Sequence, residues 1–108
     1  DAYSYFDKVM LYADALRAFL SRGGIMAWGL VPTADPERLR GESSETLLGM
    51  WRARIEQLGR IGIDPERVAA QSIITPSCGA GLLSPQDAER VLRLLSDLSR
   101  SVHPLYFA

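Results

Sequence analysis

The stretch Ile25-Met26-Ala27-Trp28-Gly29-Leu30-Val31 decides the fold class, because its residues are apolar throughout with no polar alternation. Glycines precede this run and Pro32 follows it. A short continuous apolar run between glycine and proline is typical of a β-strand that is buried on both faces. The sequence therefore predicts a strand over residues 25–31 that needs cover on both sides.

A second, shorter apolar run predicts another strand at Ser72–Thr75, just before Pro76. The link between the two strands is about 40 residues long, which is too long for a hairpin and long enough for a crossover helix. Within this link, Leu47, Trp51, Ile55 and Leu58 recur on one face of a predicted helix. The two strands are therefore expected to be parallel.

Helical patterns account for much of the remaining chain. The predicted helices are Ser4–Ser21, Ser44–Arg60, a start at Asp64-Pro65-Glu66, and a last helix from Ser84 to His103-Pro104. Residues 32–43 are predicted to form a polar loop. The buried stripe of the last helix is predicted to be Ala88, Val91, Leu92, Leu95, Leu98 and Val102. The order helix, strand, helix, strand, helix is typical of an α/β protein.

Composition indicates one domain over residues 1–108, with 47% hydrophobic and 23% charged residues. Twelve basic and 13 acidic residues give a net charge of −1, which argues against nucleic-acid binding. No apolar run is long enough to span a bilayer, so no membrane partner is expected. Cys78 is the single cysteine and has no internal disulfide partner, which fits the cytoplasm.

Two parallel strands on their own leave two open sheet edges, and parallel strands usually lie inside larger covered sheets. The chain is therefore expected either to form a homo-oligomer through its strand edges or to belong to a larger barrel. Its start at Asp1, with no preparatory segment, suggests a piece of a longer protein.

The segment Ile73-Ile74-Thr75-Pro76-Ser77-Cys78-Gly79 places the only thiol directly after the second strand. The carboxyl ends of strands carry the chemistry of many α/β proteins, so Cys78 is a candidate reactive group. A lone cysteine is also often a small buried hydrophobe. The rest of the chain offers no evident base for a cysteine nucleophile.

Several segments together resemble the end of a cobalamin-independent methionine synthase-like protein, in the superfamily of methionine synthases and uroporphyrinogen decarboxylases. They are Asp1-Ala2-Tyr3, Leu11-Tyr12-Ala13-Asp14, Arg22-Gly23-Gly24-Ile25, Ala27 to Thr33, and Ile73 to Gly79. The resemblance covers nearly the whole chain. It implies a TIM (β/α)8 barrel, of which this chain is the C-terminal portion with strands seven and eight.

The resemblance also implies a function for the parent protein, namely transfer of a methyl group to a small-molecule thiol on zinc. Cys78 matches the family's Pro-x-Cys-Gly turn and is carried over as a zinc ligand. The His and Cys that complete the family's site on an earlier strand are absent from this chain. The chain alone is therefore expected to hold zinc weakly, if at all, and to be inactive.

Five residues are candidates for substrate binding: Asp1, Tyr3, Trp28, Pro32 and Thr33. Pro32 and Thr33 follow the first strand, at the end where the site of a barrel opens. Asp1 and Tyr3 would lie at the tip of the preceding strand. The plainer alternatives are a solvated terminus for Asp1, and barrel packing and strand termination for Trp28, Pro32 and Thr33.

The expected activity of the parent is that of a methyltransferase of the 5-methyltetrahydropteroyltriglutamate–homocysteine type, in methionine biosynthesis. One alternative is a non-catalytic oligomerising module. Another is a barrel of the decarboxylase branch, which needs no zinc, so the cysteine in its turn argues against that branch.

Overall fold

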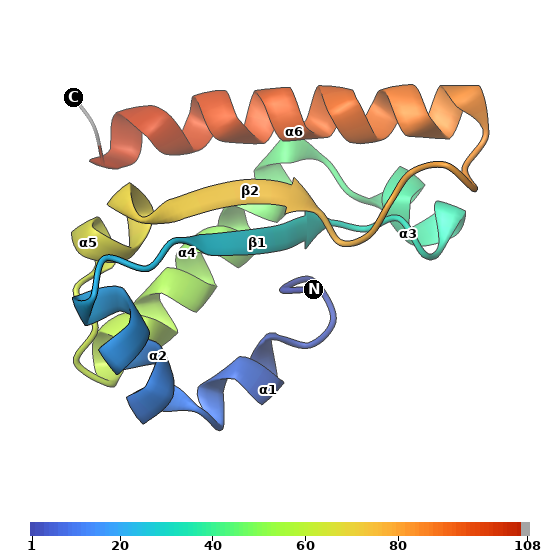
Figure 1. Ribbon diagram of the computed structural model, residues 1–108. Coiled ribbons are helices and arrows are strands. Elements are labelled where there is room, and N and C mark those ends of the chain that lie inside the picture. The colour runs from blue at the N-terminus through green and yellow to red at the C-terminus, as the bar shows by residue number, and fades with distance from the viewer. Residues whose placement is uncertain (107–108) are drawn as a thin grey trace.

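Two parallel strands lie side by side at the centre of the molecule (Figure 1). The computed structural model describes residues 1–106, with β1 at Met26–Val31 and β2 at Ser72–Pro76. Met26 lies opposite Ser72 and Trp28 opposite Ile74, with an irregularity between Gly29 and Val31. The prediction of a mixed α/β chain with two parallel strands is confirmed.

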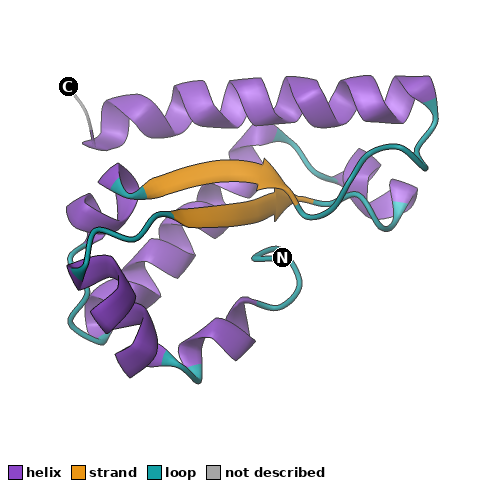
Figure 2. Cartoon of the chain, viewed as in Figure 1, coloured by secondary structure: helices purple, strands orange, loops and turns teal. Residues whose placement is uncertain are grey.

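Helices make up most of the remaining structure (Figure 2). They are α1 (Phe6–Met10), α2 (Ala13–Ser21), α3 (Pro36–Gly41), α4 (Ser44–Arg60), α5 (Pro65–Ala70) and α6 (Pro85–Tyr106). Side-chain oxygens of Asp35, Ser43 and Asp64 accept hydrogen bonds from backbone N–H groups at the starts of α3, α4 and α5. These caps satisfy donors that have no partner inside a helix. The predicted helix Ser44–Arg60 is confirmed.

The predicted single helix over residues 4–21 is wrong, because the chain forms two helices with a break at Leu11 and Tyr12. The N–H groups of these two residues donate to carbonyls only three residues back, at Lys8 and Val9. A straight helix would set Phe6 and Leu20 about 21 Å apart along its axis. The break lets both side chains reach the same core, where both are buried.

Two further expectations are corrected. Residues 32–43 are not all loop, since Asp35-Pro36-Glu37-Arg38 starts α3 just as Asp64-Pro65-Glu66-Arg67 starts α5. The last helix does not stop at His103-Pro104 but continues to Tyr106. A proline in a last turn removes only one backbone hydrogen bond, and Tyr106 packs against the core beyond it.

The buried stripe of α6 also differs from the predicted one. Val91, Leu98 and Val102 are buried as expected, whereas Leu92 is 66% exposed and Leu94 takes its place in the core. Both leucines fit an amphipathic spacing in sequence, so only the rotation of α6 against its neighbours decides between them.

The core centres on aromatic rings from four different elements. Trp28 of β1 stacks on Phe6 of α1 at 5.5 Å and meets Trp51 of α4 edge-on at 5.0 Å. Trp51 in turn meets Tyr106 of α6 at 6.5 Å. The indole N–H of Trp28 donates to Ser72 Oγ of β2 at 2.8 Å. Trp28 therefore links both strands to the helices.

The two faces of the sheet are covered unequally. Trp28, Leu30 and Ile74 pack into the core on the face toward the helices. Ala27 and Ile73 alternate with them along the strands, and both are exposed. The sequence predicted cover on both faces of β1, and this holds for its last residues, Trp28 to Val31.

An ion pair joins α3 to the start of α6. Arg40 donates to Asp87 through Nη2 at 2.9 Å, and the Asp87 side chain is only 10% exposed. Arg90 of α6 also donates to the carbonyl of Glu42 at 2.6 Å. The hydrogen bond from the Arg40 guanidinium lowers the pKa of the Asp87 carboxyl. Burial opposes this less strongly, and the Ser84 hydroxyl adds a weaker lowering of the pKa.

The two tryptophans differ in a way that mutation can measure. Trp28→Phe loses the hydrogen bond to Ser72 as well as volume, so we expect a cost of about 2–4 kcal/mol. Trp51 Nε1 is buried with no hydrogen-bond partner among the described residues. Trp51→Phe removes this unpaired donor together with the volume, so its cost should be lower by about 1 kcal/mol or more. Urea unfolding of the two variants tests this, and an equal or reversed order contradicts it.

The ion pair of Asp87 predicts an acid-dependent loss of stability. The pKa of Asp87 is lower in the folded state than in the unfolded state, where it is about 4. The carboxylate therefore stabilises the fold fully above the unfolded pKa, and this stabilisation is lost as the pH falls through the folded-state pKa. Asp87→Asn should lower the melting temperature at neutral pH, and this difference should shrink below about pH 4. Asp14→Asn is the control, because Asp14 pairs with Arg17 on an exposed surface. A difference that is independent of pH would contradict the assignment.

Candidate functional site

Three segments meet at Gly29, near the carboxyl end of β1. The N–H groups of Ala2 and Tyr3 both donate to the carbonyl of Gly29 at 3.0 Å. A Cβ at Gly29 would lie 3.0 Å from the Cα of Ser77 and 3.3 Å from the Cα of Asp1. The absence of a side chain here is what lets the chain start and the turn after β2 approach β1 so closely.

Arg54 of α4 holds the first residues in this position. Its guanidinium donates to the carbonyls of Ala2 at 2.7 Å and Tyr3 at 3.0 Å. The same group lies over the Phe6 ring, 5.2 Å from its centre. Burial lowers the pKa of Arg54, although an arginine remains charged at neutral pH. One side chain thus fixes residues 2 and 3 against β1.

Ser77 and Thr33 tie the two strand ends together. The N–H of Ser77 donates to the carbonyl of Val31 at 2.8 Å, which extends the pairing of the strands by one bond. The N–H of Thr33 donates to Ser77 Oγ at 3.1 Å, and the two hydroxyl oxygens lie 3.2 Å apart. Thr33 is buried by this arrangement.

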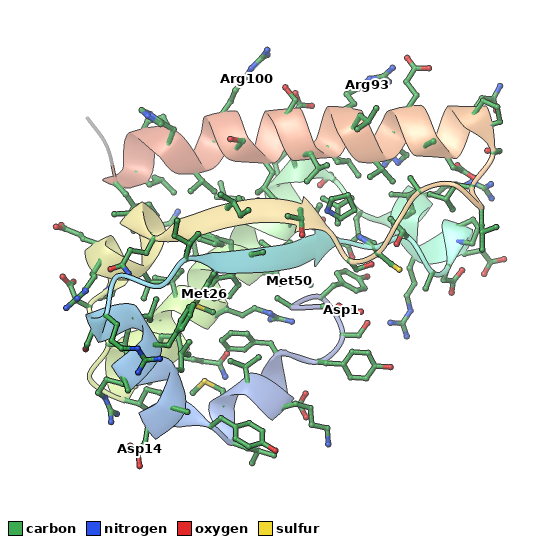
Figure 3. The ribbon with its side chains drawn as sticks, in the orientation of Figure 1. Asp1, Asp14, Met26, Met50, Arg93 and Arg100 are labelled. Atoms are coloured by element: carbon green, nitrogen blue, oxygen red, sulfur yellow. The ribbon has the colours of Figure 1, made fainter. Side chains whose placement is uncertain are left out.

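A cavity of about 230 Å³ opens at this end of the strands. Its lining residues are Asp1, Tyr3, Ser4, Pro32, Ala34, Asp35, Arg38 and Ser77. Figure 3 shows Asp1 at this end of the molecule, below the tips of both strands. The structure therefore brings together three of the candidate residues, Asp1, Tyr3 and Pro32, from segments far apart in sequence.

The other candidates lie elsewhere. Thr33 is hydrogen-bonded to Ser77, which lines the cavity, but Thr33 itself does not line it. Trp28 is 1% exposed and sits in the aromatic core with its N–H occupied by Ser72, which matches the packing alternative. Cys78 follows Ser77 in the turn, and its thiol is exposed.

Sequence reasoning missed Asp35, Arg38 and Ser77 as lining residues. Asp35 and Arg38 lie within residues 32–43, which were predicted as a polar loop, and Ser77 occupies the variable position of the Pro-x-Cys-Gly turn. A usable signal was present for Ser77, which lies two residues after the predicted strand Ser72–Thr75, where side chains reach the site end of a sheet.

The cavity carries groups of both charges. Asp1 Oδ1 accepts from the N–H groups of Tyr3 and Ser4, both at 2.9 Å, and Asp35 caps α3. The Arg38 side chain forms no hydrogen bond or ion pair with another residue of the described range 1–106. The Tyr3 hydroxyl donates to Glu42 Oε1 at 3.1 Å; burial and, next, the negative charge of Glu42 raise the pKa of this phenol. Carboxylates and a guanidinium around one small space suit a ligand with both an amino and a carboxyl group.

The residues around Cys78 do not by themselves form a zinc site. Within residues 1–106, no three His, Cys, Asp or Glu side chains lie close enough together to hold a metal ion. Zinc in proteins takes at least three such ligands. If Cys78 binds zinc, the other ligands come from outside these residues.

Comparison of the chain with models of known families, with curated proteins and with solved structures yields no match. Among the helices formed by residues 1–106, none has the length and apolar character needed to cross a membrane.

The close approach at Gly29 gives a direct test of how the cavity is built. Gly29→Ala places a methyl group against backbone atoms of Asp1, Pro76 and Ser77, which cannot move aside as a flexible side chain does. We expect a loss of about 1–3 kcal/mol and weaker protection of the Ala2 and Tyr3 amides in hydrogen exchange.

The matched control is Gly49→Ala in α4, where a Cβ would meet no atom within 4 Å. This change should stabilise the chain by about 0.5–1 kcal/mol, because alanine favours the helix. Equal effects of the two substitutions would show that the crossing at Gly29 does not constrain the N-terminal segment.

Proposed function

We propose that this chain forms the last two strand–helix units of a methionine synthase-like (β/α)8 barrel and one wall of its active site. In that barrel a methyl group is transferred to a small-molecule thiol, with Cys78 as one ligand of a zinc ion that activates the thiol. The chain alone is inactive in this proposal, and the complete protein works in the cytoplasm.

The observation that carries the proposal is the meeting of Asp1, Pro32 and Ser77 at one end of two parallel strands. Barrel enzymes place their sites at the carboxyl ends of the strands. Cys78, the residue of the Pro-x-Cys-Gly motif, comes directly after this cavity wall. The hydrogen bonds from Ala2 and Tyr3 to the Gly29 carbonyl also hold the first residues, which form a turn and not a strand, beside β1.

The charge pattern of the cavity supports a thiol amino acid as methyl acceptor. Arg38 would pair with a carboxylate, and Asp1 or Asp35 with an ammonium group, since all three residues line the same space. The methyl acceptor that the family resemblance implies, homocysteine, carries both of these groups and a thiol.

The unequal cover of the sheet supports a barrel as well. The helices lie on one face, and the opposite face exposes Ala27 and Ile73. In a closed barrel this second face points into the interior, where it packs against side chains of other strands.

Cys78→Ser in the complete protein that contains this chain tests the proposal. The reading frame before Asp1 should encode the earlier strand–helix units with a His and a Cys close together. Removing a zinc ligand should lower the amount of bound zinc. It should also lower the rate of methyl transfer by at least about a hundredfold, because mutating a residue that only hydrogen-bonds to a zinc ligand already lowers metal affinity or activity about 10–100-fold. Thiol consumption with homocysteine and labelled 5-methyltetrahydropteroyltriglutamate measures the rate.

Leu82→Ala is the control, because Leu82 lies in the same loop and is fully exposed. It should leave zinc content and rate unchanged. Methyl transfer that survives Cys78→Ser would refute the role of the cysteine. Release of carbon dioxide without zinc would assign the protein to the decarboxylase branch instead.

A further inference from the structure

The hydroxyl group of Ser77 has Thr33 as its hydrogen-bond partner within residues 1–106. Its Oγ accepts from the Thr33 N–H at 3.1 Å and lies 3.2 Å from Thr33 Oγ1. A serine hydroxyl has one proton to donate and two lone pairs that accept. The N–H uses one lone pair, so the direction of the bond between the two hydroxyls decides whether Ser77 keeps a proton for another partner.

The surroundings of Thr33 determine this direction. Thr33 is 7% exposed and does not line the cavity. Among the described residues, Ser77 Oγ is the hydrogen-bond partner of the Thr33 hydroxyl. If Ser77 donated to Thr33, the Thr33 proton would be buried without an acceptor, and leaving a buried donor unsatisfied costs more than a typical hydrogen bond contributes. Thr33 is therefore the donor.

Ser77 is then left with a proton to donate. Both lone pairs of its Oγ are occupied by the N–H and the O–H of Thr33, and its own proton has no acceptor among residues 1–106. Ser77 lines the cavity at the carboxyl ends of the strands. The proton is thus available to a molecule in this cavity, and an acceptor atom of that molecule can take it.

The charges around the cavity indicate which acceptor fits. Arg38 lines the same cavity, and its side chain has no hydrogen bond or ion pair with another described residue. Asp1 and Asp35 line it too, and their negative charges disfavour a doubly charged group such as phosphate. A carboxylate carries a single charge and accepts on two oxygens, which suits a guanidinium together with a hydroxyl donor.

We propose that Ser77 and Arg38 together bind the carboxylate of an amino-acid ligand, and that Thr33 is a positioning residue that keeps Ser77 a donor. The amino-acid class of the ligand rests on the proposed function. The donor state of Ser77 follows from its contacts with Thr33 and depends neither on methyl transfer nor on zinc. Thr33 therefore acts on the ligand through Ser77 although it does not line the cavity.

Calorimetric titration of the complete protein that contains this chain tests the proposal with two probes, L-methionine and its carboxamide, L-methioninamide. Both probes carry an amino group and no thiol, but only methionine has a carboxylate. The unaltered protein should bind methionine more tightly. Ser77→Ala should weaken the binding of methionine by about tenfold or more and that of the carboxamide by less, because hydrogen bonds to charged groups are the stronger ones.

Thr33→Val and Thr33→Ser form a matched pair. Valine has nearly the shape of threonine but no hydroxyl, so Ser77 regains a lone pair and can turn its proton toward other acceptors. Methionine binding should weaken by about threefold or more. Serine keeps the hydroxyl and should restore both the affinity and the preference for methionine. A merely structural role of Thr33 would leave the preference between the two probes unchanged.

Ser101→Ala is the control for the loss of a serine hydroxyl. The Ser101 hydroxyl donates to the carbonyl of Asp97 within α6, and neither residue lines the cavity. This variant should bind both probes as the unaltered protein does. Circular dichroism verifies the fold of each variant, and if Ser77→Ala does not fold, the two Thr33 variants decide.

Three results would each overturn the proposal: methionine that does not bind, a preference that Ser77→Ala leaves unchanged, or the same preference in both Thr33 variants. The titration needs no turnover. A protein that shows the expected preferences but transfers no methyl group would therefore refute the proposed function and leave the roles of Ser77 and Thr33 standing.

Discussion

The contacts of Trp28 are the constraint on which the rest of the structure depends. Its ring lies between Phe6 of α1 and Trp51 of α4, and its N–H binds Ser72 of β2. Buried aromatic side chains remove roughly 150–250 Å² each from water and contribute much of the stability of a core. Among residues 1–106, which form two strands, this one side chain joins α1, the crossover helix α4 and the sheet.

The same strand, one residue later, determines where the cavity forms. Gly29 follows Trp28 and lets Asp1 and Ser77 approach β1 where Trp28 has already fixed it to the helices. Arg54, three residues after Trp51 on α4, then binds the carbonyls of Ala2 and Tyr3. The walls of the cavity thus rest on the aromatic core, although none of the three core rings of Phe6, Trp28 and Trp51 lines it.

Several elements could be predicted because local physics alone decides them. The helix Ser44–Arg60 has a capping residue, an apolar stripe and a glycine after its end, and these signals agree. The two strands were recognisable as apolar runs between turn residues, and the length of their link, with a helix inside it, indicated a parallel arrangement. The break at Leu11 and Tyr12 could not be predicted, because no proline or glycine marks it and it follows from the need to bury Phe6 and Leu20 together.

For the candidate site, sequence alone determined which residues stand at strand ends, since Pro32, Ser77 and Cys78 follow apolar runs directly. Tertiary structure decided which of them share a space. It joined Asp1 and Tyr3 to this end through Gly29 and added Arg38 from a helix where a loop was expected. It also placed Trp28 in the core. Spacing along a chain specifies the face and the end of a strand, but the segments that meet there depend on contacts between residues far apart in sequence.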